Sequence, residues 1–412
     1  MMDKRVIELA DKIEAKLKDK FAKIDKTSLS NTGRLLEIYR ENRVSANMFA
    51  GTSGYGYDDL GRDTFEKVFA EAMGAEKAIV RNNFVNGTHA IATAMFACLR
   101  PGDVLLAATG IPYDTLQAAI GLTGDYPGSM KYYGIGYDEV PLLDNGEPDL
   151  ENIRLNAADK RVKCVEIQRS RGYANRPTLS VRKIGEICDI VHAVNPEAKV
   201  VVDNCYGEFV QETEPPVVGA DLIAGSLIKN PGGGLIATGG YVAGKSKLVD
   251  AAAMRLSVPG IGGECGSYEG GYRLHFQGLM NAPHTVAQAL KTVIFCAGML
   301  EELGYKASPA SDEERYDIIQ SVELGKAELL EKFCRGIQFA SPVDSYVTPI
   351  PWDMPGYEDQ VIMAAGTFVQ GASIELSCDG PMREPYTAFM QGGLTYELGK
   401  LGVMNAIDML LK

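Results

Sequence analysis

Asp203 and Lys229 are the two residues whose types and spacing could do chemistry together. Asp203 directly follows the apolar run 200–202, and Lys229 closes a hydrophobic stretch that begins with the apolar run 222–224. A carboxylate at the end of a buried strand is unfavourable unless a charged or hydrogen-bonding group meets it, and lysine is rarely buried without a partner. The 26 positions between them correspond to about one strand and one crossover. Both side chains can therefore reach one cavity at the carboxyl edge of a sheet.

This pairing favours a site for pyridoxal phosphate (PLP). A desolvated lysine with a lowered pKa is the usual amine for a Schiff base, and PLP also needs a carboxylate that keeps its ring nitrogen protonated. We expect Lys229 to carry the cofactor and Asp203 to hold the ring nitrogen. Each residue taken alone has a simpler interpretation. Asp203 could be a turn or helix-cap residue. Lys229 could be a surface lysine before a glycine-rich turn, or it could belong to a glycine-rich loop that binds phosphate. The P-loop spacing is absent, because Lys229 precedes its glycines.

A phosphate site is indicated where Gly87 and Thr88 begin a predicted helix directly after a predicted strand. Glycine lets the backbone approach a ligand, and the first N–H groups of a helix are free to bind a phosphate. Ser226, three residues before Lys229, is a further candidate ligand. The glycine and threonine alone are a weak signal, because an ordinary helix N-cap has the same composition.

Two further side chains could complete such a site. Tyr113 opens a predicted helix after a strand and could stack on the PLP ring, or it could be a core tyrosine. Arg383 stands between two prolines, where a fixed guanidinium is suited to a two-point grip on a substrate carboxylate. Alternatively, Arg383 could form a surface salt bridge with Glu384 or Asp379. Arginines at positions 169 and 171 face either solvent or the site.

The elements that must position these residues alternate along the chain. Six short apolar runs are predicted as buried strands: 78–80, 104–107, 162–167, 200–202, 222–224 and 240–243. Helical patterns are predicted between several of them: 88–99, 113–121 and 181–194. Such alternation predicts an α/β fold with a mostly parallel sheet that helices cover on both faces.

The two ends of the chain have a different pattern. Helices are predicted before the first strand at 3–24 and 33–43, and a capping box of Asp63 and Glu66 predicts a helix that stops at Gly74. Longer helices at 283–303 and 313–335 and short strands at 345–349 and 371–376 predict a smaller α+β domain. The predicted organisation is an N-terminal helical segment (1–50), a large PLP-binding domain (51–280) and a small C-terminal domain (281–412).

Composition limits the partners. The chain has 41 basic and 54 acidic residues, and the net charge of −13 argues against nucleic acid or an anionic membrane as a partner. Eight cysteines form no C-x-x-C pair, so we expect reduced thiols, and no residue is assigned to a metal. The N-terminus lacks the apolar core of a signal peptide, and no long uncharged apolar run follows. We therefore expect a cytoplasmic protein.

The chain resembles the aluminium resistance protein family, which is similar to cystathionine β-lyase and methionine γ-lyase among the PLP enzymes of Cys/Met metabolism. The resemblance covers nearly the whole chain. It rests on these segments: GYGYDDLGRDT (54–64), NGTHAI (86–91), RPGD (100–103), PYDTL (112–116), IQRSRGY (167–173), VDNCYGEF (202–209), GSLIKNPGGG (225–234), SPVDS (341–345), MPGYE (354–358) and GPMREPY (380–386). The chain departs from the usual E-T-P-x-N-P and S-x-T-K motifs of Cys/Met lyases at 166–171 and 226–229.

The resemblance implies PLP fold type I with a mostly parallel seven-stranded sheet, in a homotetramer built from tight dimers. It implies these roles: the Schiff base at Lys229, the ring nitrogen at Asp203, phosphate contacts from Gly87 and Thr88, ring stacking by Tyr113 and substrate-carboxylate binding by Arg383. In Cys/Met enzymes a tyrosine from the neighbouring subunit reaches the phosphate, and Tyr55 or Tyr57 of the loop 54–59 stands at the comparable place.

The expected function is a PLP-dependent carbon–sulfur lyase that acts on a sulfur-containing amino acid. Lys229 would leave the cofactor when the substrate amine arrives, and would then act as the base at Cα. The alternatives are another PLP reaction on the same scaffold, such as transamination or racemisation, and a regulatory protein that binds PLP without turnover. The fold fixes the cofactor better than the reaction.

Overall fold

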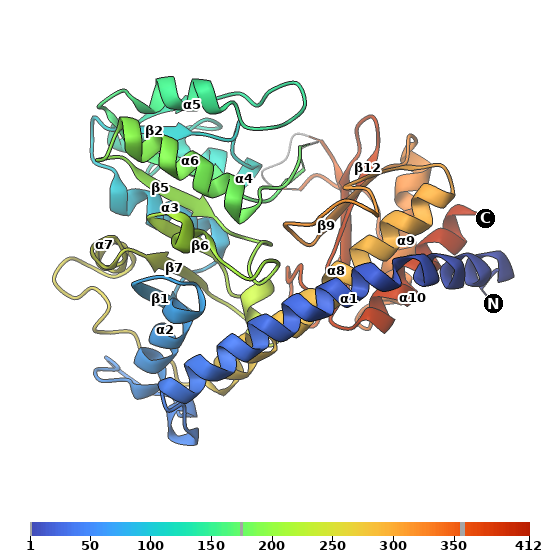
Figure 1. The fold of residues 1–412 in the computed structure, drawn as a ribbon, viewed down its shortest axis with the longest axis horizontal. Coiled ribbons are helices and arrows are strands. Elements are labelled where there is room, and N and C mark those ends of the chain that lie inside the picture. The colour runs from blue at the N-terminus through green and yellow to red at the C-terminus, as the bar shows by residue number, and fades with distance from the viewer. Residues whose placement is uncertain (1, 174–175, 355–358) are drawn as a thin grey trace.

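The computed structural model describes residues 2–173, 176–354 and 359–412, and it contains a seven-stranded sheet and a five-stranded sheet (Figure 1). The strand order of the larger sheet is β1-β7-β6-β5-β4-β2-β3. Its strands are β1 (Lys77–Arg81), β2 (Val104–Ala107), β3 (Gly136–Glu139), β4 (Val162–Gln168), β5 (Lys199–Asp203), β6 (Leu222–Ser226) and β7 (Gly240–Gly244). Among these strands only β7 runs antiparallel to its neighbours. The predicted α/β class with a mostly parallel sheet is confirmed.

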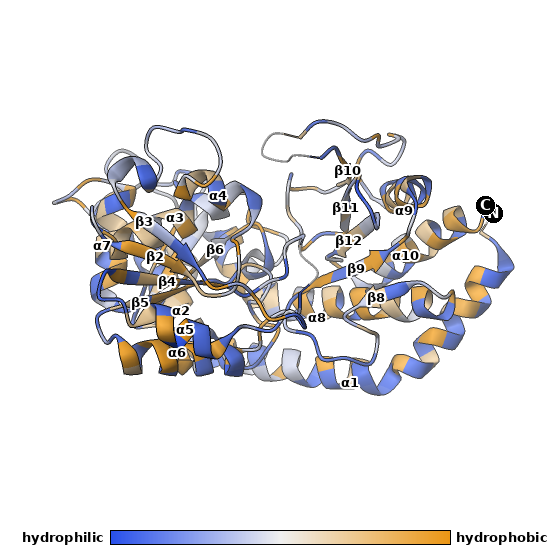
Figure 2. Ribbon diagram, turned by 90° about the horizontal axis from the view of Figure 1, so that it is seen from above, coloured by the Kyte–Doolittle hydropathy of each residue, from blue (hydrophilic) through white to orange (hydrophobic). Residues whose placement is uncertain are grey.

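Helices cover both faces of the larger sheet. One face packs against α3 (Gly87–Cys98), α4 (Asp114–Ile120) and α7 (Ser246–Leu256). The other face packs against α2 (Leu60–Ala72), α5 (Leu150–Ala157) and α6 (Val181–Val194). In Figure 2 the inner strand β2 is largely hydrophobic, and the helices around the sheet carry both hydrophobic and hydrophilic residues, as expected for a sheet that helices cover on both faces.

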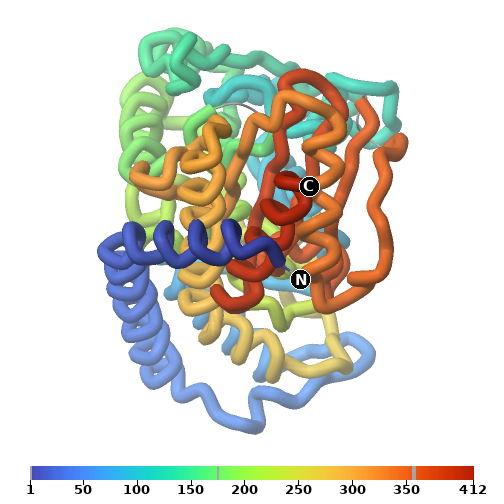
Figure 3. Tube along the Cα trace, turned by 90° about the vertical axis from the view of Figure 1, so that its right-hand side faces the viewer, coloured from blue at the N-terminus to red at the C-terminus, as the bar shows by residue number. Residues whose placement is uncertain are grey.

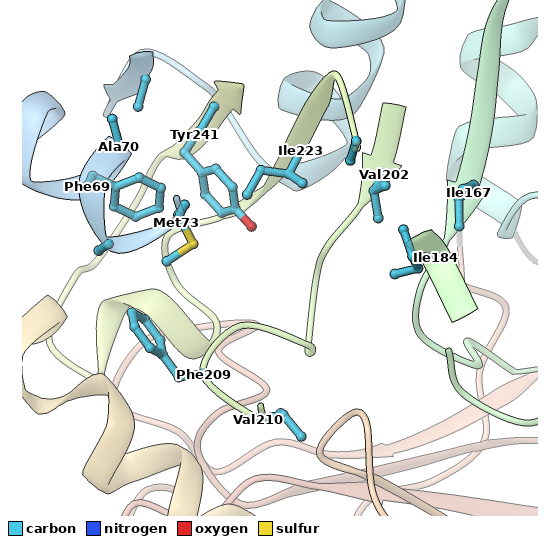
Figure 4. Packing of buried hydrophobic residues seen from close by; sticks show 14 of the residues in the cluster. Phe69, Ala70, Met73, Ile167, Ile184, Val202, Phe209, Val210, Ile223 and Tyr241 are labelled. Atoms are coloured by element: carbon cyan, nitrogen blue, oxygen red, sulfur yellow. The ribbon is translucent and has the colours of Figure 1, made fainter. Parts of the chain in front are cut away.

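Side chains of the strands alternate between these two faces. In Figure 4, Val202 and Ile223 lie among the residues of the core that α6 covers, with Ile184 nearby, and Phe69 of α2 lies beside Tyr241 with ring centroids 4.8 Å apart. Val201 and Asp203, on either side of Val202 in β5, therefore point to the opposite face of the sheet, which α3 covers. The alternation of side chains along the strand thus places the carboxyl group of Asp203 beneath α3.

The five-stranded sheet belongs to the C-terminal part and is antiparallel throughout. Its strands are β8 (Lys306–Ser308), β9 (Ile319–Glu323), β10 (Val361–Ala364), β11 (Ser377–Pro381) and β12 (Thr387–Gln391). The helices around it are α8 (Arg273–Glu302), α9 (Ala327–Ala340) and α10 (Tyr396–Leu410). Four short 3₁₀ helices complete the described elements: η1 (Ala46–Phe49), η2 (Lys131–Tyr133), η3 (Pro215–Val218) and η4 (Asn230–Gly232).

The N-terminal region is one helix, α1 (Lys4–Glu41), where two were predicted. The predicted break at 25–32 is polar, but α1 lies along α8 and also contacts α2 and α10 (Figures 1 and 3). Asn31, within the expected break, is fully buried and donates to the carbonyl oxygens of Phe209 and Gln211. Tertiary packing therefore overrides the weak local helix propensity.

Several predicted boundaries were wrong. Helix α2 is capped by Asp59, whose carboxylate accepts from the backbone N–H of Arg62, and not by Asp63. The predicted helix 313–335 is instead a loop, the strand β9 and the start of α9, and residues 345–349 form no strand. The segment 371–376 precedes β11, and the edge strand β3 was not predicted. Short strands at sheet edges lack the apolar runs on which such predictions depend.

The division at 1–50, 51–280 and 281–412 stays a prediction; α8 runs through position 280 without interruption. Within the described residues, no helix combines the length and the apolar character that crossing a membrane requires.

Candidate active site

A cavity of about 530 Å³ lies at the carboxyl ends of the parallel strands, and residues of both the larger and the smaller sheet regions line it. Seven of the nine predicted site residues line it: Gly87, Thr88, Tyr113, Asp203, Ser226, Lys229 and Arg383. Tyr55 and Tyr57 are not among its described lining residues. The fold thus gathers side chains that are almost 300 positions apart in the chain.

Asp203 and Lys229 come from neighbouring strands. Asp203 is the last residue of β5, is 4% exposed, and accepts a hydrogen bond of 3.1 Å from the backbone N–H of Cys205. Lys229 follows β6 by three residues, and its Nζ lies 3.9 Å from the centroid of the Tyr206 ring. Burial raises the pKa of Asp203, while the nearby Lys229 opposes this rise. The two groups therefore act on each other electrostatically across the cavity.

The pKa of Lys229 corrects one expectation. Burial lowers it, but the side chains of Cys205, Tyr206 and Asp203 around the ammonium raise it, and the result lies well above the ordinary value of lysine. The lowered pKa expected from burial was wrong, because Asp203 at the end of β5 and Cys205 and Tyr206 just after it surround the amine. In this arrangement Lys229 is charged and half-buried.

The N-terminus of α3 faces the same cavity. Asn86 caps the helix by accepting from the backbone N–H of His89 at 2.9 Å, and Gly87 and Thr88 begin it. A Cβ at position 87 would lie 3.2 Å from the Cβ of Ser226. Glycine therefore keeps open a space between the helix terminus and the end of β6, where backbone N–H groups favour an anion.

Tyr113 is held in place from two sides. Its backbone N–H donates to Oε1 of Gln168 at 3.0 Å, and its hydroxyl is hydrogen-bonded to Thr88, which also contacts the hydroxyl of Thr115 at 3.0 Å. Burial and the nearby Asp203 raise the pKa of Tyr113, so its phenol stays neutral. The ring is half-buried and lines the cavity, as a stacking residue must.

Arg383 stands at the mouth of the cavity. Its side chain is 56% exposed and pairs with Asp359 at 3.0 Å, a different carboxylate from the two considered from the sequence. Such an exposed ion pair contributes little, about 0–1 kcal/mol. Arg383 can therefore exchange Asp359 for another carboxylate.

Tyr55 and Tyr57 lie on the surface instead, 73% and 62% exposed, with ring centroids 5.6 Å apart. Their loop is tied down by Arg62, which donates to the carbonyl of Gly56 at 2.6 Å, and by the backbone N–H of Gly266, which donates to the carbonyl of Tyr55 at 3.0 Å. The loop is therefore a fixed, outward-facing feature.

Sequence reasoning did not assign three side chains that line the cavity: Gln168, Arg176 and Tyr206. Tyr206 has a positive φ of 72°, an uncommon conformation for an aromatic residue. The signal that could have found them is position, because Gln168 is the last residue of β4, Arg176 lies in the segment that follows β4, and Tyr206 lies just after β5. The sequence left open whether Arg169 and Arg171 face solvent or the site. Both side chains are buried: Arg171 lines the cavity, whereas Arg169 pairs with Glu214 at 3.1 Å.

Glu166 is an unexpected buried acid behind the cavity. It lies on β4 in register with Val201 of β5, is fully buried, and neither carboxyl oxygen has a hydrogen-bond partner among the described residues. Burial and the nearby Asp203 raise the pKa of Glu166 to about 8, against the opposing effect of Arg176. Glu166 is therefore predominantly protonated at neutral pH.

The profile of the methionine gamma-lyase family matches residues 6–411. The chain belongs to this family. Membership makes it a PLP-dependent carbon–sulfur lyase. The protein YnbB of Bacillus subtilis strain 168, named only as uncharacterized, is 49% identical over 404 residues, which cover 98% of this chain and 96% of YnbB.

Solved structures of several bacterial proteins are similar over nearly the whole chain. A Clostridium novyi protein named as a carbon-sulfur lyase involved in aluminum resistance is 46% identical, with a TM-score of 0.95 and coverage of 99% and 96%. A Listeria monocytogenes protein, named as a candidate cystathionine beta-lyase involved in aluminum resistance, is 50% identical, with a TM-score of 0.96 and coverage of 98% and 99%. The PLP-dependent protein YhfS of Escherichia coli shares the fold at 16% identity, with a TM-score of 0.60 and coverage of 94% and 96%.

The residues of the cavity fit the cofactor of this family. The amine of Lys229 can bind the aldehyde of PLP, and the buried carboxylate of Asp203 can hold its ring nitrogen. The N-terminus of α3, with space beside Gly87, can bind its phosphate. The volume of about 530 Å³ lies within the range of small-molecule sites.

Proposed function

We propose that the chain cleaves the carbon–sulfur bond of a sulfur-containing amino acid, with Lys229 holding PLP as a Schiff base. The observation that carries this proposal is the placement of Lys229 and Asp203 in one cavity, at the ends of adjacent strands. Bound PLP supplies an electron sink that weakens the bonds at Cα of the substrate.

The other cavity residues would hold the cofactor. Asp203 would keep the ring nitrogen protonated, since a carboxylate at the end of β5 favours a cation beside it. Gly87 and Thr88 at the N-terminus of α3, with Ser226, would bind the phosphate. Tyr113 would lie against the ring, because its backbone and hydroxyl are both fixed by hydrogen bonds.

Lys229 would move the protons of the reaction. Once the substrate amine displaces it, Nζ is free to accept the proton from Cα and to deliver a proton to the departing sulfur. The carbon–sulfur bond then breaks, and the sulfur leaves as a thiol. Arg383 would bind the substrate carboxylate in place of Asp359, through two parallel hydrogen bonds.

The assembly we propose is a homotetramer of tight dimers. Tyr55 and Tyr57 are exposed on a loop held by Arg62 and do not line their own cavity, so they are available to a neighbouring subunit. One of them would reach the phosphate of the neighbour. The smallest competent unit would then be a dimer.

The test combines borohydride reduction with a product assay. Reduction of the holoenzyme should fix the cofactor to Lys229, which peptide mass spectrometry locates; an adduct on another lysine refutes the assignment. A screen of sulfur amino acids should release thiol and keto acid in equal amounts. Keto acid without thiol would indicate transamination instead, and a racemised substrate without either would indicate a racemase.

A further inference from the structure

The cavity carries an excess of basic side chains. Its described lining residues include four bases, Lys229, Arg171, Arg176 and Arg383, and two acids, Asp114 and Asp203. In the proposed function Lys229 and Asp203 serve the cofactor, and Arg383 serves the α-carboxylate of the substrate. Arg171 and Arg176 have no role in that scheme, although both are buried.

Arg176 is anchored but not neutralised. It is 7% exposed, and its Nη1 and Nη2 donate to the main-chain carbonyl oxygens of Thr109 and Ser170, the latter at 2.7 Å. No carboxylate of the described residues lies within ion-pair distance of its guanidinium. Carbonyl oxygens orient a guanidinium but leave its charge uncompensated, and a buried uncompensated charge is unfavourable.

Arg171 is anchored in the same way from the other side. It is 1% exposed, and its Nη1 donates to the carbonyl of Ser308 at 2.8 Å and to the hydroxyl of Ser321 at 2.6 Å. Its Nε has no hydrogen-bond partner among the described residues. Each arginine lies within electrostatic range of the other, and burial lowers the pKa of both. Two fixed cations thus share one wall of the cavity.

The acids nearest to Arg176 do not compensate it. Glu166 and Asp203 act on it only over a distance. Glu166 is predominantly protonated at neutral pH, for the reasons given above, and Asp203 is committed to the ring nitrogen in the proposed function. Asp317 also lies within range, but it acts on the buried Arg171 and Arg315 as well, so one carboxylate is shared among three guanidinium groups. An anion from outside the chain is therefore the group that this wall is built to receive.

We propose that Arg176, supported by Arg171, binds a carboxylate at the distal end of the substrate side chain. The preferred substrates are then sulfur-containing amino acids that carry a second acidic group. This inference rests on the proposed function, because it assumes that Arg383 takes the α-carboxylate.

The test compares two amino acids that differ at the far end of the side chain. L-2-aminoadipate has a distal carboxylate and L-norleucine does not, and neither has a sulfur that could leave. Spectral titration of the holoenzyme should show that aminoadipate binds about tenfold to a hundredfold more tightly, as expected for a charged hydrogen-bond pair. Arg176→Gln should remove this preference and leave the affinity for norleucine unchanged.

Two control variants separate this role from others. Arg383→Gln should weaken both ligands by the same factor, since both carry the α-carboxylate. Arg315→Gln removes an arginine that is also buried and anchored to main-chain carbonyls but does not line this cavity; it should leave the preference intact. If Arg176→Gln fails to fold, Arg176→Lys keeps the charge without the two-point geometry and should lose part of the preference.

Three results would overturn the inference: equal affinities in the parent, a preference that survives in Arg176→Gln, or equal weakening of both ligands by that variant. Calorimetric titration with glutarate, which has two carboxylates and no amine, tests the wall without PLP chemistry. Glutarate should bind the parent at least about tenfold more tightly than Arg176→Gln. If no amino acid perturbs the spectrum, the proposed function fails, while the glutarate result still decides the anion site.

Discussion

Replacement of Glu166 by glutamine should change how the stability of the protein depends on pH. Glu166 is fully buried, and its two carboxyl oxygens have no hydrogen-bond partner among the described residues. Its pKa is raised from 4.5 to about 8, chiefly by burial and then by Asp203. In the unfolded chain Glu166 loses its proton near pH 4.5, whereas in the folded protein it keeps the proton until about pH 8. Between these values the folded state therefore binds one more proton.

The magnitude follows from this difference of about 3.5 pH units. Each unit is worth 1.36 kcal/mol, so Glu166 alone lowers the free energy of unfolding by about 5 kcal/mol as the pH rises from below 4.5 to above 8. Because burial in this sheet is complete, no discount for solvent screening applies. Glutamine has the same shape and cannot ionise, so Glu166→Gln should lack this loss. The variant should gain stability relative to the parent by about 4 kcal/mol between pH 5 and pH 8.

Urea unfolding of both proteins at fixed ionic strength, from pH 5 to pH 8.5, measures this gain. The exposed Glu8, replaced by glutamine, is the matched control and should give a curve parallel to that of the parent. Infrared difference spectroscopy gives an independent readout, since the parent at pH 7 should show the carbonyl band of a protonated acid that Glu166→Gln lacks. Parallel stability curves for the parent and Glu166→Gln would refute the reasoning, because Glu166 would then ionise alike in both states.

Two further outcomes are expected. Glu214→Gln should cost about 3–5 kcal/mol of unfolding free energy, because it leaves the fully buried Arg169 without its ion-pair partner. The double variant Arg169→Met with Glu214→Leu should recover much of this loss. A loss below about 1 kcal/mol in Glu214→Gln would contradict the role of this buried ion pair. Replacement of both Tyr55 and Tyr57 by phenylalanine should weaken PLP retention during dialysis without changing the melting temperature of the PLP-free protein. A fully active monomer in sedimentation would disprove the shared site.

The sequence by itself determined the framework of the site. Strands β2, β4, β5 and β6 were predicted within about two residues, because central strands buried on both faces are short continuous apolar runs. The same local pattern placed Asp203 at the end of one such strand and Lys229 shortly after the end of another. Since the ends of parallel strands meet at one edge of the sheet, their proximity followed without any knowledge of tertiary contacts.

Only the tertiary structure decided the rest, because burial and the compensation of charge depend on elements that are distant in the chain. Arg171 is buried because Ser308 and Ser321 of the smaller sheet receive its guanidinium. The proton that Glu166 keeps, and the raised pKa of Lys229, depend on which groups surround them and on how little water reaches them. The sequence lists such side chains, but only the packing of one region against another determines which of them lose their contact with water and which find a partner.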